Sequence, residues 1–385
     1  MLNLQLRKFV SSSSTKHLKT RVAWASARQY SSNEAPKASV KLIAELRKQT
    51  EVSMSKAREA LIATNNDLSA ALEWVKKDLE ISGAKKAEKV GGRETKEGLI
   101  AVSVLSPGLG EGTGGVRAAM IELNCETDFV GRNDLFAKLS ADIAHTCAYH
   151  AEEAIDFQEN PTLLRPFNTE VLLDAPFIQK DPTQSLSSPE SSVQSAIRDT
   201  IAKVGENITL RRAVSVVLSP APPEVNAGLR VASFIHNALS IDRNLGRMGT
   251  LSLLYLQSPS LLKLFKDKEF REDLEKLERG LTRQIVGFDP RSIRHVSGDP
   301  EIALYKQPFA LFPGAFAGQP VGPALDAWAV QKGLIVDGSD AGQGLAVSEF
   351  IKWGVGQDLS SGKVVSTLAD EKDALDLKEE PKQSS

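Results

Sequence analysis

One cysteine and two histidines are the residues best suited to covalent chemistry in this sequence. Cys125 could act as a nucleophile with His145 or His150 as its base, because a thiol must become a thiolate to react. Cys125 shares one face of an expected strand with Leu123, and we expect that face to be buried. Buried thiols are usually inert, which disfavours an enzyme. The chain has only two cysteines, Cys125 and Cys147, which are too few for a disulfide framework. Neither has metal-ligand spacing, so we expect no metal site.

Residues 108–115 form a glycine-rich segment that could cradle a phosphate group. Such a cradle requires a helix that begins directly after the glycines. An apolar run at 116–123 follows instead and predicts a strand, with the run at 99–105 as its hairpin partner. The segment also lacks a Gly-Lys-Ser/Thr sequence. We therefore predict the flexible tip of a β-hairpin and expect no cofactor.

A polar stretch after this second strand carries one large apolar side chain, Phe129. A helix is expected from Asp134 to about His150, with Asn133 or Asp134 as its cap. Phe129 and the adjacent Asp128 could belong to the core or could be offered to a partner. Loop aromatics pack inward more often than not, so the residues alone favour the core for Phe129.

The charge distribution separates the first 33 residues from the rest of this 385-residue chain. They hold six of the 47 basic residues and no acid, which leaves 41 basic and 49 acidic residues, a net charge of −8, in the remainder. Binding to nucleic acid depends on neutralising phosphates, so no direct contact with nucleic acid is expected. No run approaches the ~20 apolar residues of a membrane span, so no membrane partner is expected.

Residues 1–30 are basic, rich in serine and free of acids, which is the composition of a mitochondrial transit peptide. Arg28 occupies position −3 of a predicted matrix-protease site that cuts after Tyr30. The segment could instead be a disordered basic arm. We expect a protein of the mitochondrial matrix and exclude these residues from the predicted fold.

Residues 38–82 contain three runs with the apolar spacing of short helices, and Ser53 and Asp67 are expected amino-terminal caps. Three helices in so few residues predict a bundle of the ubiquitin-associated type. By itself, such a module suggests binding to ubiquitin or to a partner helix. The lysine-rich segment at 83–97 is predicted to be a solvated linker.

The remainder of the chain predicts two related subdomains, at 98–222 and 228–365. Each contains a pair of strands and an amphipathic helix. The helix of the first subdomain spans 193–204 and ends at Gly205, a residue suited to a carboxyl-terminal cap. The helix of the second spans 270–286.

Two segments do not follow this pattern. Residues 151–190 are interrupted by five prolines and should be irregular, although the apolar run at 171–173 predicts some ordered structure. Residues 366–385 are predicted to be an acidic, flexible tail. The fold class is therefore predicted to be α+β, with a three-helix bundle followed by two small antiparallel sheets packed with helices.

Twelve consecutive residues, Glu122-Leu-Asn-Cys-Glu-Thr-Asp-Phe-Val-Gly-Arg-Asn133, resemble the signature of the elongation factor Ts family and depart from it only at Gly131. Four further blocks resemble the family in the same order: 46–67, 203–212, 233–249, and the closing segments 307–309 and 347–358. Two departures concern turns. Glu51 and Ser53 occupy positions where bacterial members usually carry glycines, and Asn237 replaces the usual glycine after His236. The long helical excursion of bacterial members cannot fit between 290 and 307.

The resemblance implies a guanine nucleotide exchange factor that binds mitochondrial EF-Tu and has no catalytic residue of its own. It also implies the residues that contact EF-Tu: Met54, Thr127, Asp128, Phe129, Val130, Asn133, Val204, Gly205, Glu206, Asn207 and His236. In this interpretation Phe129 enters a crevice of the partner, and Asp128 places a negative charge near its cation and phosphates. The alternative is a ubiquitin-associated-type adaptor without exchange activity.

Overall fold

The computed structural model describes residues 37–50, 52–110, 114–153, 162–181, 191–222, 225–294, 300–312, 314–335 and 343–367. The chain divides into two units, 1–37 and 38–385, and the following account concerns the second. The predicted transit peptide and nearly all of the predicted acidic tail lie outside the described residues. Apart from the linker at 83–97, the predicted module boundaries within the second unit stay predictions.

Three helices open the unit, as the apolar spacing predicts: α1 (Val40–Thr50), α2 (Met54–Ala63) and α3 (Leu68–Val90). Both expected caps are present, because the Ser53 side chain accepts a hydrogen bond from the Lys56 amide and Asp67 accepts from the Ser69 and Ala70 amides. Leu46, Leu61 and Val75, one from each helix, are buried in a shared core. Core packing, together with the caps of α2 and α3, thus stabilises a bundle in which α1 and α2 have only 11 and 10 residues.

The prediction of a linker at 83–97 is wrong for its first half, because α3 continues to Val90. Gly83, Ala87 and Val90 recur at helical spacing on the face of α3 that packs inward, and the lysines between them lie outside it. At Gly83 a Cβ atom would lie 3.1 Å from the Arg198 carbonyl oxygen, so α3 and α7 (Val193–Val204) approach closely. The lysine-rich composition concealed this narrow apolar stripe.

Two antiparallel sheets form the centre of the unit. The first has the strand order β3 (Arg165–Phe167), β4 (Ile208–Leu218), β2 (Val116–Cys125), β1 (Glu97–Pro107) and β6 (Leu245–Gly246). The second has the order β5 (Ala227–His236), β7 (Met248–Gln257), β8 (Gly344–Gly354) and β9 (Val365–Ser366). The predicted hairpin is confirmed, since β1 pairs with β2 along its whole length.

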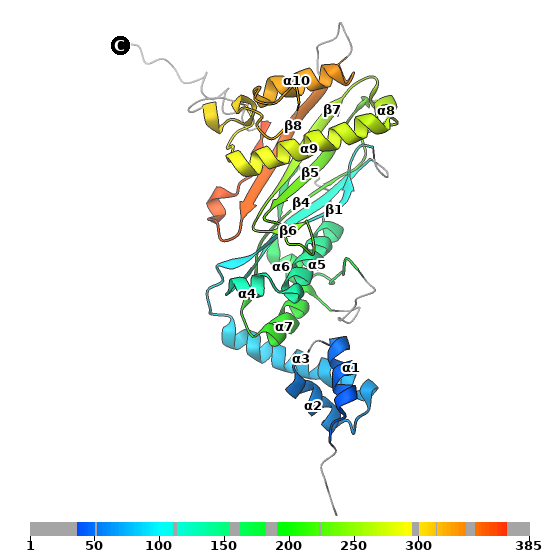
Figure 1. The fold of residues 1–385 in the computed structure, drawn as a ribbon, viewed down its shortest axis with the longest axis vertical. Coiled ribbons are helices and arrows are strands. Elements are labelled where there is room, and N and C mark those ends of the chain that lie inside the picture. The colour runs from blue at the N-terminus through cyan, green and yellow to red at the C-terminus, as the bar shows by residue number, and fades with distance from the viewer. Residues whose placement is uncertain are drawn as a thin grey trace, which may run out of the picture. The chain divides into compact units, whose positions relative to one another are not determined.

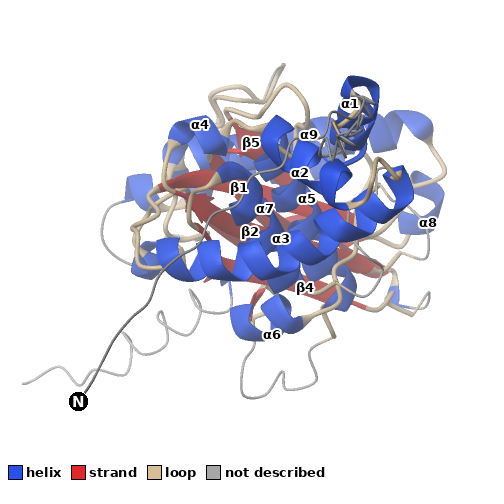
Figure 2. Ribbon diagram, turned by 90° about the horizontal axis from the view of Figure 1, so that it is seen from below, coloured by secondary structure: helices blue, strands red, loops and turns tan. Residues whose placement is uncertain are grey.

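The sheets and helices stack in layers, and the alternation of side chains along β1 explains how. Leu99 and Ala101 belong to a core shared with α5 (Asp134–His150) and α7, whereas Ile100 and Val102 face the second sheet. Figure 2 shows α3, α7 and α5 in front of the first sheet. On the outer face of the second sheet lie α9 (Lys268–Phe288) and α10 (Val321–Gln331), visible in Figure 1.

Shorter elements complete the described chain. They are α4 (Asp128–Gly131), α6 (Thr169–Asp174), α8 (Leu261–Leu264) and the 3₁₀ turns at Pro300–Ile302, Leu304–Lys306 and Leu359–Ser361. The ordered part expected within 151–190 is confirmed, because α6 buries Leu172 and β3 pairs with β4. Neither α10 nor β6 is among the predicted elements.

Strand β6 connects the two halves of the chain. It follows β5 of the second sheet in sequence, yet Gly246 pairs with Ile100 at the edge of the first sheet. A Cβ atom at Gly246 would lie 2.5 Å from Ile235 Cγ2, so only glycine fits there. The loop after β5, which begins with Asn237, is thereby held beside the start of β1.

Candidate partner-binding site

The stretch between β2 and α5 is a one-turn helix, α4, rather than an irregular segment. Thr127 caps it, with the Thr127 side chain accepting from the Val130 amide. Val130 and Gly131 are buried, whereas the Phe129 ring is 82% exposed. The core location that the residues alone favoured for Phe129 is therefore wrong, because the anchoring apolar side chain of this turn is its neighbour Val130.

Cys125 lies at the end of β2 on the buried face expected for it. Its side chain is fully buried and its Sγ atom donates to the Thr127 carbonyl oxygen at 3.2 Å. Burial, reinforced by the negative charges of Glu206 and Glu97, raises the pKa of the Cys125 thiol to about 12. Burial also lowers the pKa of His145. A thiol this weakly acidic stays protonated at neutral pH, so the enzymatic hypothesis has no nucleophile here.

Two family-like blocks, distant in sequence, are joined by a network that we call the cross-brace: Glu126, Thr127, Glu206 and Asn207. The Glu206 carboxylate accepts from the Thr127 amide at 3.0 Å and from the Thr127 hydroxyl at 2.7 Å. In return, the Glu126 carboxylate accepts from the Asn207 amide at 2.6 Å. Each block thus supplies one carboxylate to the backbone of the other, so 126–127 and 206–207 form one structural unit.

The cross-brace also reaches the segment after α3. The Asn207 side-chain amide donates to the Arg93 carbonyl oxygen at 2.8 Å, and the Arg93 guanidinium pairs with Glu126 at 3.3 Å. Asn207 is only 6% exposed and is occupied by these internal contacts. The second half of the predicted linker is therefore fastened to the candidate site.

The turn after α7 leaves backbone available to a partner. Gly205 has φ = 80° and is the left-handed cap that ends the helix, as predicted. No atom lies within 4 Å of the position where its Cβ would be, and the residue is exposed. Val204 is half-buried against the first core. The helix stop explains the glycine, and the open space beside it leaves room for an approaching surface.

The exposed side of α4 borders a groove of about 520 Å³. Asp128, Gly131 and Arg132 line one part of it, and Asn237 lines another part beside the start of β1. His236 is exposed at the end of β5, directly before this lining residue. The structure therefore brings the predicted His236 region to the same groove as α4.

The charged groups around α4 are paired but accessible. Asp128 forms an ion pair with Arg132 at 3.2 Å, and both side chains are substantially exposed. Asn133, as expected, caps α5 by accepting from the Leu135 amide at 2.8 Å. Asp128 does not provide the cap of α4, because Thr127 does.

Met54 is the first residue of α2 and is 57% exposed. Its neighbours Ser53 and Ser55 line a second hollow, of about 340 Å³, together with Ala202 and Lys203 near the end of α7. Met54 is thus exposed beside a hollow whose lining includes Lys203, the residue directly before Val204.

Asn237 explains one departure from the family pattern. Its φ of 52° lies in the left-handed region, which glycine favours and asparagine tolerates. The substitution therefore preserves the backbone path from His236 into the groove.

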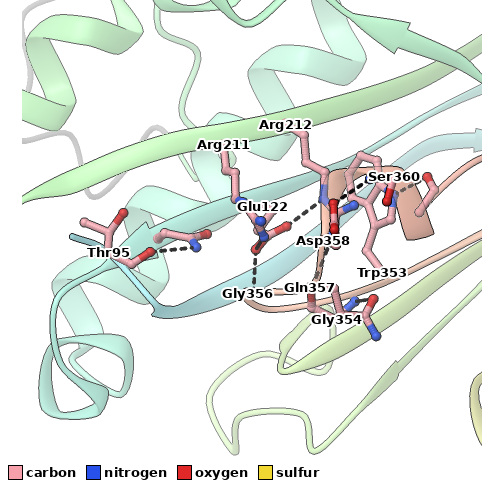
Figure 3. Close-up of polar contacts among 12 residues, drawn as sticks. Thr95, Glu122, Arg211, Arg212, Trp353, Gly354, Gly356, Gln357, Asp358 and Ser360 are labelled. Carbon is pink, nitrogen blue, oxygen red and sulfur yellow. Dashed lines mark hydrogen bonds and ion pairs between the residues drawn. The ribbon is translucent and has the colours of Figure 1, made fainter.

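Sequence reasoning missed a buried ion cluster at the start of the signature stretch, shown in Figure 3. The Glu122 carboxylate accepts from Arg211 Nη1 at 2.9 Å, Arg212 Nε at 2.6 Å and the Gly356 amide at 2.8 Å. The Arg212 guanidinium lies 4.4 Å from the Trp353 ring centroid. This cluster ties β2 and β4 to the end of β8. The only local signal was an acid between Ile121 and Leu123 in an apolar strand.

Two features are absent from the residues that the structure describes. Within those ranges, no helix is long and apolar enough to cross a membrane. Among the same residues, no group of three or more His, Cys, Asp or Glu side chains could hold a metal ion.

Comparisons with known proteins identify the family. The family model for elongation factor TS matches residues 126–296. The mitochondrial elongation factor Ts of Coprinopsis cinerea is 53% identical over 84% of this chain and 93% of its own length. That of Laccaria bicolor is 49% identical over 86% of this chain and 96% of its own length. That of Cryptococcus neoformans is 32% identical over 84% of this chain and 88% of its own length. Such identity over nearly whole relatives shows that the chain belongs to the elongation factor Ts family of mitochondria, whose members are nucleotide exchange factors and not catalytic enzymes.

Proposed function

We propose that this protein binds mitochondrial EF-Tu in the matrix and promotes GDP release by disturbing the partner's Mg²⁺ and phosphate site, which supports translation elongation. The names of the relatives support the elongation role. The observation that carries the mechanism is Phe129, an aromatic ring left 82% exposed on a helix that is otherwise anchored. A large apolar side chain held in water gains most when it enters a partner's crevice.

The contact surface follows from exposure. Asp128, Phe129, Gly205, His236 and Met54 are accessible and form the direct contacts in this proposal. Val204 and Asn133 flank them. Four predicted residues remain. Thr127, Val130 and Asn207 are partly or fully buried and maintain the backbone that presents the others, and the partly buried Glu206 is hydrogen-bonded to Thr127.

The chemistry requires no bond to be made. A GTPase of this class holds its nucleotide through backbone amides, a lysine and a Mg²⁺ ion that bridges the phosphates. Mg²⁺ tolerates little departure from octahedral geometry, so a small displacement of its surroundings weakens the nucleotide. Phe129 supplies the displacement, and Asp128 adds a negative charge near the site that the cation vacates.

Thermodynamic linkage then fixes the reverse effect. If the factor lowers the affinity of its partner for GDP by some ratio, GDP lowers the affinity of the partner for the factor by the same ratio. GDP therefore ejects the factor, and GTP completes the cycle.

The test is release of a fluorescent GDP from mitochondrial EF-Tu, followed by stopped-flow fluorescence with an excess of unlabelled nucleotide. Micromolar full-chain protein should accelerate release. Co-purification with EF-Tu should be reversed by added GDP. Unchanged release at these concentrations would overturn the proposal.

A further inference from the structure

We propose that Glu206 is a positioning residue for nucleotide exchange, which acts through Thr127 and α4 and does not itself contact the partner. This inference rests on the proposed function and assigns Glu206 a different role from the direct contact that the family resemblance implies. Both Glu206 carboxylate oxygens are engaged inside the protein, one by the Thr127 amide at 3.0 Å and the other by the Thr127 hydroxyl at 2.7 Å. A contact between this carboxylate and EF-Tu would have to share both oxygens with Thr127.

Helix α4 needs external support because it has only four residues. One helical turn does not repay the entropy of fixing its own backbone. Its cap is also long, with 3.4 Å between the Val130 amide nitrogen and Thr127 Oγ1. The Glu206 carboxylate accepts the hydrogen bond that the Thr127 hydroxyl donates, which leaves the lone pairs of the hydroxyl oxygen to face the Val130 amide. It also places a negative charge at the amino-terminal end of the turn.

The direction of Phe129 depends on this turn. On the inner side, Val130 is 8% exposed and joins the first core. Glu206 fixes the amino-terminal end, and Val130 fixes the middle. Phe129 lies between Thr127, which is bonded to Glu206, and Val130, which is packed in the core. These two neighbours fix the backbone of the turn and so direct the exposed Phe129 side chain outward.

Glu126 is the reciprocal residue of the same cross-brace. It accepts from the Asn207 amide at 2.6 Å and thereby keeps the backbone that carries Glu206 in place. Glu126 also pairs with Arg93, so its removal disturbs more than the turn. Glu206, whose hydrogen bonds within the described residues all go to Thr127, is therefore the cleaner residue to test.

The chain provides a matched control with the same chemistry. Glu153 accepts from the Ser219 amide at 2.9 Å and from the Ser219 hydroxyl at 2.6 Å, a two-point contact like that of Glu206 on Thr127. Ser219 follows the carboxyl-terminal end of β4, whereas Glu206 precedes its amino-terminal end. An 11-residue strand therefore separates the two sites. Loss of Glu153 removes an equivalent contact away from α4.

The experiment is a double-mutant cycle of Glu206→Ala and Phe129→Ala, measured as kcat/KM for GDP release from mitochondrial EF-Tu. We expect Glu206→Ala to lower kcat/KM about 10-fold in the native background. In the Phe129→Ala background it should lower kcat/KM less than about 2-fold, because Glu206 acts only by directing the Phe129 side chain, which is already absent there. Glu206→Gln, which keeps one acceptor oxygen, should recover part of the loss. Glu153→Ala should change kcat/KM less than about 2-fold.

Independent losses that multiply in the double variant would show direct contact and overturn the inference. A wild-type protein that fails to accelerate release would instead overturn the proposed function, so the two failures differ. If Glu206→Ala does not fold, Thr127→Val removes the hydroxyl donor while keeping the side-chain shape and is subjected to the same cycle. Hydrogen exchange provides a second measurement: amides of 127–131 should exchange faster in Glu206→Ala but not in Glu153→Ala, and equal protection would contradict the inference.

Discussion

Two residues of the signature stretch, Glu122 and Phe129, have opposite environments although only seven positions separate them. Glu122 is 0% exposed and accepts hydrogen bonds from three groups, whereas Phe129 is 82% exposed. The charged residue is inside and the aromatic residue is outside, which inverts the usual preference. Within one motif, therefore, Glu122 stabilises the contact between the two sheets, whereas Phe129 is exposed to solvent.

The boundary between the two roles is the end of β2. Up to Cys125 each residue has a partner on β1 and on β4, and every side chain from Ala118 onward is buried. After Cys125 the chain leaves the sheet and must satisfy its backbone groups elsewhere. The cross-brace does this for the amides of Thr127 and Asn207, which fastens the short helix to the fold.

The largest effect is expected from Glu122→Ala. It leaves Arg212 buried without its carboxylate, which should lower the free energy of unfolding by about 3–5 kcal/mol. Exchange per folded molecule should change less than about twofold. Urea unfolding and the GDP-release assay measure the two quantities.

The matched control is Glu94→Ala, whose ion pair with Lys96 is largely exposed and should contribute less than about 1 kcal/mol. Loss of exchange by Glu122→Ala at unchanged stability would contradict the division of roles within the stretch.

Phe129→Ala should show the reverse pattern. Loss of a burial worth about 1.5–3 kcal/mol in the complex corresponds to exchange slowed by about 10- to 150-fold. The free energy of unfolding should change by less than about 0.5 kcal/mol, because the ring is exposed in the free protein.

Phe136→Ala provides the comparison for Phe129→Ala. Phe136 is fully buried, and its loss should cost about 3–5 kcal/mol of stability. Equal destabilisation by the two substitutions would place Phe129 in the core after all.

Cys125→Ala changes the last residue of β2, which lies between Glu122 and Phe129. Removal of a small buried group should lower the free energy of unfolding by about 1 kcal/mol and leave exchange within about twofold of the native rate. An enzyme that uses this thiol would instead lose its activity completely, so the GDP-release assay separates the two hypotheses.

The smallest effect is expected from Gly131→Ala, which restores the residue of the family pattern. A Cβ atom there would lie 3.7 Å from Cys125 Sγ and 3.8 Å from the Gly98 nitrogen, both ordinary contacts. With less freedom in the unfolded chain, the variant should be more stable by about 0.5 kcal/mol in urea unfolding. Gly205→Ala is the contrasting glycine: its φ of 80° should make alanine destabilising by about 1 kcal/mol. If both alanine variants were more stable than the native protein, the backbone φ would not decide the effect of replacing glycine at these positions.

Local signals in the sequence predicted most of the secondary structure. The hairpin of β1 and β2, the helices α5, α7 and α9, the caps Ser53 and Asp67 and the left-handed stop at Gly205 all depend on residues within a few positions of one another. Periodicity could not reveal α4, which is a single turn, or β6, which has two residues. It also missed α10, for which no strand or helix was predicted.

By itself, the sequence determined the family, the fold class and the candidate residues. Only the tertiary structure decided which candidates face solvent, because the exposure of Phe129 depends on its neighbours and not on its own type. The tertiary structure also paired Glu206 with Thr127, 79 positions away, and Glu122 with Gly356, 234 positions away. Hydrogen bonds over such separations form only once packing has brought the segments together, so no local pattern encodes them.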